Sequence, residues 1–453
     1  MSATIEKIKL EKEIIMDDIT ENKSELNIDE DKLAKLRAKL LNKQKETEMT
    51  ANHNNVAKRD KSIKFGVVGS GQAGSRIAET FYKLGYDAVC INLAQQDLKF
   101  ISIPESNKLH LNWGLGGAAK DLSIGKAAAE QYKPQIAGLV SAQLADAQVL
   151  ILALSLGGGS GAGSCETLVD VLTATGKPVC VITALPMDSD GQQTKANALQ
   201  TLSKLSRYAQ SKKISNLIVV DNAKIEAVYS GVSQIDFFDI ANSAIVEPID
   251  LFNTVSSLPS SSKPFDPMEW AKLITDGSGL TTYGTIKVHN YQEEDSLASA
   301  VIENLNTNLL AGGFDLKQSK YVGIVIAANA NVWKSISASS VNYSLSLVED
   351  QCGTPVDVFR GVYVIDSPED CVMIYSIFSG LGLPTARVEQ LKKETEKMAN
   401  TTKTKEDNRH TTLHLDTGTD QAVSKVQEIK NRVAAKSSAF GKLLSNNVID
   451  RRK

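Results

Sequence analysis

A pair of glycine-rich segments, each directly after a short apolar run, constrains this sequence most. Residues Gly69–Gly74 have the sequence GSGQAG and follow Ile63–Val68, and residues 157–164 have the sequence GGGSGAGS and follow Val149–Ser155. Glycine lets a backbone approach a phosphate closely, and a helix that begins there offers free N–H groups to the anion. A flexible linker is the alternative for the second segment, although a linker fits poorly between a buried strand and a packed helix. Two such loops on adjacent strands indicate a triphosphate site.

The apolar runs alternate with helical stretches. Ala88–Asn92, Val179–Ala184 and Leu217–Asp221 also have the composition of strands, and a loop rich in Gly, Asn, Asp or Ser follows each of them. This alternation predicts an α/β fold with a doubly wound parallel sheet, covered by helices on both faces. Ligands of such sheets bind at the loops beyond the carboxyl ends of the strands.

The first glycine loop alone is compatible with a nicotinamide-dependent oxidoreductase, because it satisfies GxGxxG. A dinucleotide-binding fold would also have an acid at the end of the second strand, to bind the ribose hydroxyls. Here that strand ends in Asn92, followed by Leu93 and Ala94. The sequence also lacks GxxxxGK[ST], so backbone N–H groups, serine hydroxyls and a metal ion are expected to hold the phosphates.

Composition excludes several other classes. The net charge of -3 argues against a chain that coats nucleic acid over its whole surface. The five cysteines have no CxxC or metal-ligand spacing, which predicts reduced cytosolic thiols and no dedicated metal cluster. Glu6 and Lys7 stand where a signal peptide needs an apolar core, and no later apolar run could span a membrane. We therefore expect a soluble, cytoplasmic protein without a membrane partner.

The glycine loops resemble those of a known family. GGGSGAG at 157–163 is similar to the tubulin/FtsZ signature GGGTGSG, with Ser160 in the place of the usual Thr. Gly71–Ser75 is similar to the GQCGN of tubulins, and Asn92–Gln96 resembles the second nucleotide loop of the family. Gly114–Ala118, followed by Gly125, resembles the third loop, which meets the terminal phosphate. The loops occur in the order and spacing of the family.

Resemblance extends to the ribose and the base. Asp190 lies where FtsZ-like proteins place a ribose-binding acid, whereas Thr194 lies where many have Arg and Lys195 is the nearby alternative. Asn222 and the pair Phe238 and Asn242 match the guanine site, in which a ring stacks on the base and asparagines bind its edge. Without the resemblance, Phe238 would be interpreted as a core residue and Asn242 as a residue of a helix surface.

The resemblance, which covers residues 63–385, implies a GTPase that uses GTP, GDP and Mg²⁺ and assembles head to tail with copies of itself. The implied nucleotide contacts are Gly71, Gln72, Ala73, Asn92, Gly116, Gly117, Ala118, Gly158, Gly159, Ser160, Gly161, Ala162, Asp190, Asn222, Phe238 and Asn242.

Asp266 and Glu269 resemble the D-x-x-E of α-tubulins. By the resemblance, they enter the nucleotide pocket of the next subunit, polarise the attacking water and help to hold Mg²⁺, so hydrolysis depends on assembly. The structural alternative to this catalytic role is that the two acids form the cap and the first turn of a helix that begins near Pro267. The preceding segment 260–265 departs from the GLxNxD pattern of the family.

Five regions are expected. They are a charged N-terminal extension, partly helical or disordered, over 1–62; a GTP-binding domain over 63–234; a central helix and catalytic acid loop over 235–269; a C-terminal α/β domain over 270–385; and a helical, polar and basic tail over 386–453. Pro248 is expected to kink or break the central helix. The smaller domain is marked by β-like runs at Tyr321–Ala327, Val362–Ile365 and Val372–Ile377, and the tail by a helix over Arg387–Met398 followed by a polar linker.

Both ends of the chain are charged. In the extension, Leu33, Leu36 and Leu40 lie on one helical stripe, which indicates a solvated arm, a partner-docking helix or a lateral filament contact. Residues 424–453 hold eight Lys and Arg against two acids. This end is either a solvated tail or a segment, within 420–453, that docks on DNA, a DNA-bound adaptor or an acidic protein face.

Ser160, the unusual acid loop, the arm and the basic tail together resemble divergent plasmid or phage members of the superfamily. In that subgroup filaments move or centre DNA, so we expect a filament that positions or segregates plasmid or phage DNA in a bacterial or phage-infected cell. Two alternatives inside the family are a cell-division ring protein and a scaffold that binds nucleotide without hydrolysing it.

Overall fold

The computed structural model describes residues 60–229, 233–260, 264–293, 295–353, 356–413 and 427–432. The predicted stripe of Leu33, Leu36 and Leu40 and most of the basic tail lie outside these residues. The chain divides into two compact units, 1–392 and 393–453. All of the strands described below belong to the first unit.

One ten-stranded sheet, in the order β3-β2-β1-β4-β5-β6-β7-β10-β8-β9, forms the centre of the first unit. Its strands are β1 (Phe65–Ser70), β2 (Asp87–Asn92), β3 (Lys108–His110), β4 (Val149–Ser155), β5 (Val179–Leu185), β6 (Asn216–Asp221), β7 (Leu280–Val288), β8 (Tyr321–Ala328), β9 (Asp357–Val364) and β10 (Val372–Leu381). All neighbouring strands from β3 to β7 are parallel, and β10 is antiparallel to both β7 and β8. The predicted doubly wound parallel sheet is confirmed.

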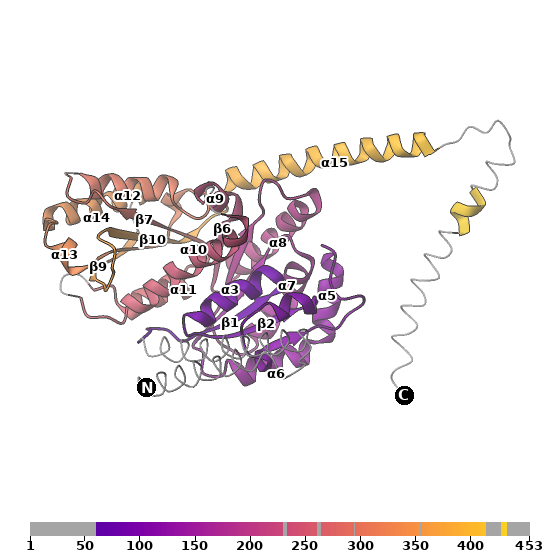
Figure 1. Cartoon of the computed structure of the whole chain (residues 1–453), viewed down its shortest axis with the longest axis horizontal. Helices are drawn as coiled ribbons and strands as arrows, with labels where there is room; N and C mark the ends of the chain where they lie inside the picture. Colours follow the sequence, from indigo (N-terminus) through magenta and orange to yellow (C-terminus); the bar gives the residue numbers. More distant parts are fainter. Residues whose placement is uncertain are drawn as a thin grey trace, which may run out of the picture. The chain divides into compact units, whose positions relative to one another are not determined.

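Helices cover both faces of this sheet (Figure 1). They are α3 (Gly71–Lys83), α4 (Gln95–Lys99), α5 (Leu122–Gln131), α6 (Lys133–Gln143), α7 (Gly159–Thr173), α8 (Gln192–Gln210), α9 (Asn222–Val228), α10 (Gln234–Val255), α11 (Pro267–Thr275), α12 (Ser296–Thr307), α13 (Ala330–Trp333), α14 (Ala338–Cys352) and α15 (Thr385–Leu413), with the 3₁₀ turns η1 (Glu105–Asn107) and η2 (Leu316–Gln318). Alternate residues of one strand enter different cores: Val68 packs on the side of α7, and Val67 on the side of α3 and α10. A strand that is buried on both faces is therefore apolar throughout.

The first strand begins and ends two residues later than predicted, at Phe65–Ser70 rather than Ile63–Val68. Gly69 pairs with Cys90 of β2 and with Ala153 of β4, so the sheet extends into the glycine segment. Neighbouring strands on both sides thus decide where the strand ends. The second predicted run of the smaller domain, Val362–Ile365, is also longer in the structure, because β9 pairs with β8 along its whole length, from Asp357 to Val364.

The central helix α10 is continuous from Gln234 to Val255, so Pro248 does not break it, and the kink expected as the other possibility stays a prediction. Proline removes one N–H from the helix and displaces the carbonyl one turn before it. Within that turn, the Tyr283 hydroxyl of β7 donates a hydrogen bond to the Ile245 carbonyl. Apolar burial of Ile245, Ile249 and Phe252 then holds the helix together on both sides of the proline.

Helix α15 is longer than predicted. It runs through the segment that the sequence predicts as a polar linker and ends at Leu413 rather than Met398. Between Thr385 and Leu413 the chain contains neither Gly nor Pro and is rich in Lys and Glu, which favour helix. The helix passes from the first compact unit into the second.

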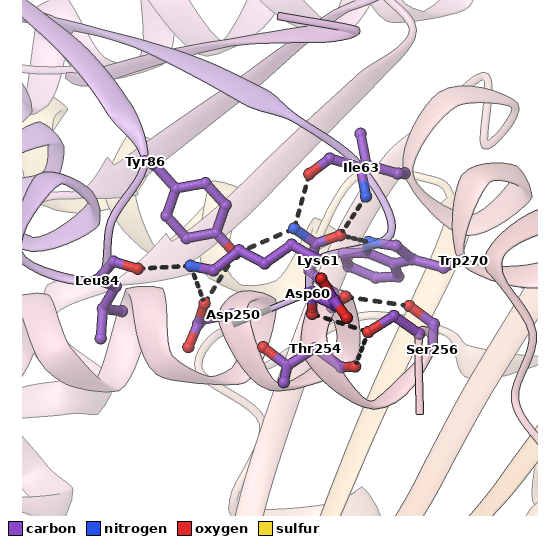
Figure 2. Close-up of polar contacts among 11 residues, drawn as sticks. Asp60, Lys61, Ile63, Leu84, Tyr86, Asp250, Thr254, Ser256 and Trp270 are labelled. Atoms are coloured by element: carbon purple, nitrogen blue, oxygen red, sulfur yellow. Dashed lines mark hydrogen bonds and ion pairs between the residues drawn. The ribbon is translucent and has the colours of Figure 1, made fainter. Parts of the chain in front are cut away.

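A buried ion pair fastens the chain, just before β1, to the central helix (Figure 2). Lys61 Nζ lies 2.9 Å from Asp250 Oδ1 and 3.4 Å above the centre of the Tyr86 ring. The Tyr86 hydroxyl donates to the same carboxylate oxygen at 2.8 Å. Burial and this carboxylate raise the pKa of Tyr86 well above its ordinary value, so the phenol stays a donor.

Next to this pair, one amide joins three elements. Asn253 Oδ1 accepts from the Ile63 N–H at 2.8 Å and from Trp270 Nε1 at 3.1 Å, and Asn253 Nδ2 donates to the Ile63 carbonyl at 2.9 Å. Figure 2 shows Ile63 and Trp270 converging there from different parts of the chain. The amino end of β1, the last turns of α10 and the first turns of α11 are therefore fixed to one another.

Replacing Asp250 by Ala should lower the free energy of unfolding by about 3 kcal/mol, because it leaves the Lys61 ammonium buried without its counter-charge. Urea unfolding followed by circular dichroism measures the change. Lys287→Gln is the matched control, because the Lys287–Glu369 pair is about half exposed and its loss should be without measurable effect. Equal stability of the Asp250→Ala variant and the natural protein would contradict this role.

Candidate nucleotide site

The two glycine loops lie in direct backbone contact. They follow the adjacent parallel strands β1 and β4, so both emerge at the carboxyl edge of the sheet. A Cβ on Gly161 would lie 2.7 Å from the Ser70 carbonyl oxygen, and Gly71 has a φ of +70° beside the Gly161 N–H. The Ser70 and Ser164 hydroxyls are hydrogen-bonded at 2.8 Å. The flexible-linker alternative is therefore wrong.

Each glycine loop becomes the first turn of a helix. Gly71, Gln72 and Ala73 open α3, and residues 159–162 open α7. The cap residues Ser70 and Gly158 make no side-chain bond to the N–H groups of the helix that follows. Two helix N-termini with uncapped N–H groups thus meet at one edge of the sheet, which is the arrangement that binds phosphates.

The third predicted loop is anchored at its base and open at its tip. At the base, a Cβ on Gly159 would lie 2.7 Å from the Ala118 Cβ. Asn197 of α8 donates to the Lys120 carbonyl at 2.7 Å and to the Gly157 carbonyl at 3.2 Å, so it ties the third loop to the second glycine loop. The sequence gives no signal for Asn197, which acts between segments that are distant along the chain.

At the tip, Gly114, Gly116 and Gly117 have positive φ, and a Cβ added to any of them would meet nothing within 4 Å. Leu115 between them is fully exposed. Gly116 and Gly117 therefore make no close contact with the rest of the protein. The next residue, Ala118, packs against Gly159 at the N-terminus of α7. The tip of this loop thus has open space around its backbone.

Asn92 ends β2 and is buried. Its Nδ2 donates to Asp97 Oδ2 at 2.9 Å, and its Oδ1 accepts from the Ala94 N–H at 3.2 Å. The side chain therefore shapes the second loop from within, and its predicted contact with the nucleotide stays a prediction.

The fifth loop, residues 186–191, is held by a bond within the loop and by a bond from Lys195 of α8. Asp190 Oδ2 accepts from the Met187 N–H at 2.9 Å, which leaves Oδ1 for a ribose hydroxyl. Lys195 is almost completely buried and donates to the Asp188 carbonyl at 2.7 Å. The Lys195 ammonium thus supports the loop, whereas Thr194, in the position where many relatives of the family have Arg, packs against Gly157.

The predicted base-binding residues come from two helices. Asn222 is the first residue of α9, and Asp221 caps that helix. Phe238 and Asn242 lie one turn apart in α10. Phe238 is 48% exposed and packs edge-on against Phe237, so it is not a core residue, and Asn242 is buried at 8% rather than on the helix surface. An accessible ring beside a buried amide suits stacking on a base.

Three helices that follow these loops share one carboxylate. Glu166 of α7 lies 2.8 Å from Lys126 of α5 and 2.9 Å from Lys204 of α8. Hydrogen bonds from Lys126 and Lys204 lower the pKa of Glu166 to about 2. Because the folded pKa is below the ordinary value of 4.5, this stabilisation is present above pH 4.5 and is lost as the pH falls towards 2.

Asp266 and Glu269 form a capping box at the start of α11. Asp266 Oδ1 accepts from the Glu269 N–H at 2.8 Å, and Glu269 Oε2 accepts from the Asp266 N–H at 3.0 Å. The expected cap role and the helix start at Pro267 are confirmed. The Asp266 side chain is exposed and that of Glu269 is partly buried, and this burial raises the pKa of Glu269.

The structure does not bring these two acids to the glycine loops of the same chain. The start of α11 is fixed through Trp270 and Asn253 to Ile63, which precedes the amino end of β1, whereas the glycine loops follow its carboxyl end. Six residues of strand span about 20 Å. The acids and the phosphate cradle therefore lie at opposite edges of the sheet.

Residues 64–230 match the GTPase domain of the Tubulin/FtsZ family, and residues 252–392 match the C-terminal domain of Tubulin/FtsZ-like proteins of the TubZ type. The chain belongs to the tubulin/FtsZ superfamily. As a member, it is a GTPase that uses GTP and GDP. The match is to a GTPase family, so we set the oxidoreductase alternative aside.

Relatives are found in archaea and bacteria. The Tubulin-like protein CetZ of Pyrococcus horikoshii is 25% identical over 323 residues, which are 70% of this chain and 85% of CetZ. The Tubulin-like protein TubZ of Bacillus cereus is 23% identical over 352 residues, 71% of this chain and 80% of TubZ. A GTPγS-form protofilament of Bacillus thuringiensis serovar israelensis TubZ has the same fold, with a TM-score of 0.69 at 20% identity, covering 79% of this chain and 98% of that one.

The part of the chain that the structure describes contains neither a membrane-spanning helix nor a cluster of metal-ligating side chains. None of its helices is long and apolar enough to cross a membrane. Its His, Cys, Asp and Glu side chains form no group of three that could hold a metal ion. All five cysteines, which the structure describes, are free and buried.

Replacing Gly161 by Ala should weaken GDP binding roughly tenfold or more, because the new methyl group would push the two glycine loops apart at a cost of about 1–3 kcal/mol. Isothermal titration measures the affinity. Gly138→Ala is the matched control: it lies exposed in α6 with nothing within 4 Å of the added Cβ, and it should raise stability by about 0.5–1 kcal/mol without changing affinity. Unchanged GDP affinity in Gly161→Ala would contradict the proposed contact between the loops and the phosphates.

Proposed function

We propose that this protein forms head-to-tail filaments in which each subunit supplies Asp266 and Glu269 to the GTP bound by its neighbour. The observation that carries the proposal is the placement of these acids at the edge of the sheet opposite to the glycine loops. Neither glycine loop contains an acid or a base. A nucleotide bound at the loops therefore gains its catalytic carboxylates when a second copy stacks on that edge.

Helix α10 supports this arrangement. Its first turns carry Phe238 and approach α3 through the contact of Asp239 with Arg76, at 3.9 Å, whereas its last turns carry Asn253. Twenty-two helical residues span about 33 Å. One rigid element thus connects the nucleotide edge to the acid edge, as a filament needs if each subunit must present both.

The chemistry requires neutralised charge on the γ-phosphate and a water in line with it. The capping box leaves one carboxylate oxygen free on each residue, Asp266 Oδ2 and Glu269 Oε1. Burial raises the pKa of Glu269, which suits this carboxylate to accept a proton from the attacking water. The uncapped N–H groups of α3 and α7 would hold the phosphate oxygens.

Mg²⁺ fits this site as an ion that the phosphates bring with them. Mg²⁺ prefers six oxygen ligands and commonly keeps waters while it contacts one or two protein oxygens and the phosphates. The Ser160 hydroxyl at the start of α7 is a suitable oxygen. When bound, the ion neutralises charge that develops between the β- and γ-phosphates.

Changing Asp266 to Asn and Glu269 to Gln together should leave GTP affinity intact and lower turnover roughly 100-fold, because the amides keep the cap but remove both charges. Filaments of this variant should persist. Phosphate release and light scattering, recorded in one cuvette over a series of protein concentrations, measure both effects. Glu303→Gln, on the exposed face of α12, is the control. Undiminished turnover in the double variant would remove the catalytic role, and turnover independent of concentration would contradict assembly coupling.

We further infer that the filament positions or segregates plasmid or phage DNA in the cytoplasm. Support comes from a neighbour described as type III plasmid segregation TubZ, which has a TM-score of 0.65 at 19% identity and covers 77% of this chain. The basic composition of residues 424–453 gives the chain a means of attachment to DNA or to an adaptor on DNA. Cell division FtsZ of Buchnera aphidicola, 24% identical over 270 residues, favours the ring-protein alternative.

Replacing the five basic residues of 425–442 with Gln should leave GTPase activity unchanged and abolish sedimentation of plasmid DNA with filaments, because it removes the charges that displace counterions from the phosphates. These residues are Lys425, Lys430, Arg432, Lys436 and Lys442. The matched control carries Lys392, Lys393 and Lys397 as Gln, which lie exposed in α15. Retained DNA in the tail variant would contradict the attachment.

A further inference from the structure

Arg387 is a buried cation in the first turn of α15. The residue is only 8% exposed, and the guanidinium lies far along the sequence from every group that it contacts. Its NH1 lies 2.8 Å from Asp188 Oδ1, and its NH2 donates to the Pro186 carbonyl at 3.0 Å and to Asp221 Oδ1 at 3.3 Å. A buried charge is costly unless its partners are well placed, so this geometry is strongly specified.

One of these partners controls the base-binding side of the nucleotide site. Asp221 ends β6 and caps α9, with its Oδ1 accepting from the Ala223 N–H at 3.1 Å. The first residue of that helix is Asn222, the residue expected to bind the guanine edge. Burial raises the pKa of Asp221, and the Arg387 charge opposes that rise. Arg387 therefore helps to keep the cap ionised and the start of α9 in place.

The other partners control the ribose side. Pro186 and Asp188 belong to the fifth loop, which carries Asp190. Arg387 binds the loop through the Asp188 carboxylate, while Lys195 binds it through the Asp188 carbonyl at 2.7 Å. Both cations therefore bind Asp188, which lies within the turn that Asp190 closes. Arg387 thus adds a direct contact between this loop and the start of α9, beside the pairing of Leu185 with Asp221 in the sheet.

We propose that Arg387 is a positioning residue of the nucleotide site, which aligns Asp190 with the ribose and Asn222 with the guanine by binding both segments at once. The inference rests on the proposed contacts of these two residues with the nucleotide. It also gives α15 a role: the helix that leads into the second compact unit begins with the side chain that orders the nucleotide site. The selectivity for guanine then depends on the position of the first turn of α15, because this turn carries Arg387.

The geometry requires arginine rather than any cation. The guanidinium is a planar fork with five N–H donors, and here it contacts two carboxylates and one carbonyl. A lysine ammonium keeps the charge but is a point donor on a flexible stem. The Arg387→Lys variant is therefore expected to restore part of the function that a neutral variant loses.

The test measures GDP and ADP affinities of the full chain below its assembly threshold, by competition against a fluorescent GDP analogue. We expect Arg387→Gln to bind GDP roughly 30-fold more weakly and to lose a similar factor of its preference for GDP over ADP, with Arg387→Lys between it and the natural protein. Lys392→Gln, which removes an exposed charge from the same helix, should change neither value.

A second variant separates the ribose side from the base side. Asp188→Asn leaves the pairing of Arg387 with Asp221 intact, so it should weaken GDP binding roughly three- to tenfold. It should reduce the preference for GDP over 2′,3′-dideoxy-GDP but keep the preference for GDP over ADP. Combined with Arg387→Gln, its effect on GDP affinity should be smaller than the product of the two single losses.

The outcomes are distinct. A folded Arg387→Gln variant with natural GDP affinity and GDP-over-ADP preference would overturn the proposal. An Arg387→Gln variant with lowered thermal stability but an unchanged preference for GDP over ADP would also overturn the proposal. Arg387 would then only stabilise the fold. If Arg387→Gln fails to fold, the Asp188→Asn ratios decide, and an unchanged ribose preference would overturn the proposal. If the natural protein showed no GDP preference, the proposed site itself would fail.

Discussion

The close approach of two backbones, those of β1 and β4 where the strands end, is the constraint on which this structure depends. Gly161 and Gly71 let the two loops touch without side chains between them, and the Ser70–Ser164 hydrogen bond joins them. The pairing of β1 with β4 and this contact between the loops place the N-termini of α3 and α7 side by side. Asn197 and the Glu166 ion pairs then fix the neighbouring loops to that point, so phosphate binding is built from backbone groups on a rigid frame.

Opposite edges of the same sheet carry the two halves of the proposed reaction. The phosphate cradle lies beyond the carboxyl end of β1, and the Asp266–Glu269 capping box is fixed through Asn253 near its amino end. A capping box serves helix stability and chemistry together, because it orients both carboxylates and still leaves one oxygen of each free. In the proposed reaction, this division of the site between two edges makes turnover a property of the filament rather than of the monomer.

Buried charges connect these parts over long distances in sequence. Lys61 joins the start of the fold to α10, and Arg387 joins the start of α15 to the fifth loop and to α9. Such pairs contribute specificity of position, since a buried ion with a misplaced partner is destabilising. Lys61 lies just before β1 and Arg387 just after β10, so the two pairs act at the two ends of the sheet-forming part of the chain.

The sequence by itself determined the parallel sheet, the glycine loops and the helix start at Pro267, because apolar runs, glycine spacing and an Asp cap act within a few residues. Tertiary structure decided what depends on distant partners. Neighbouring strands extended β1 into the glycine segment, Tyr283 and core burial kept α10 continuous across Pro248, and Arg387 found Asp188, 199 residues away. No local pattern encodes such contacts, because their residue types become partners only when the fold places them within hydrogen-bonding distance.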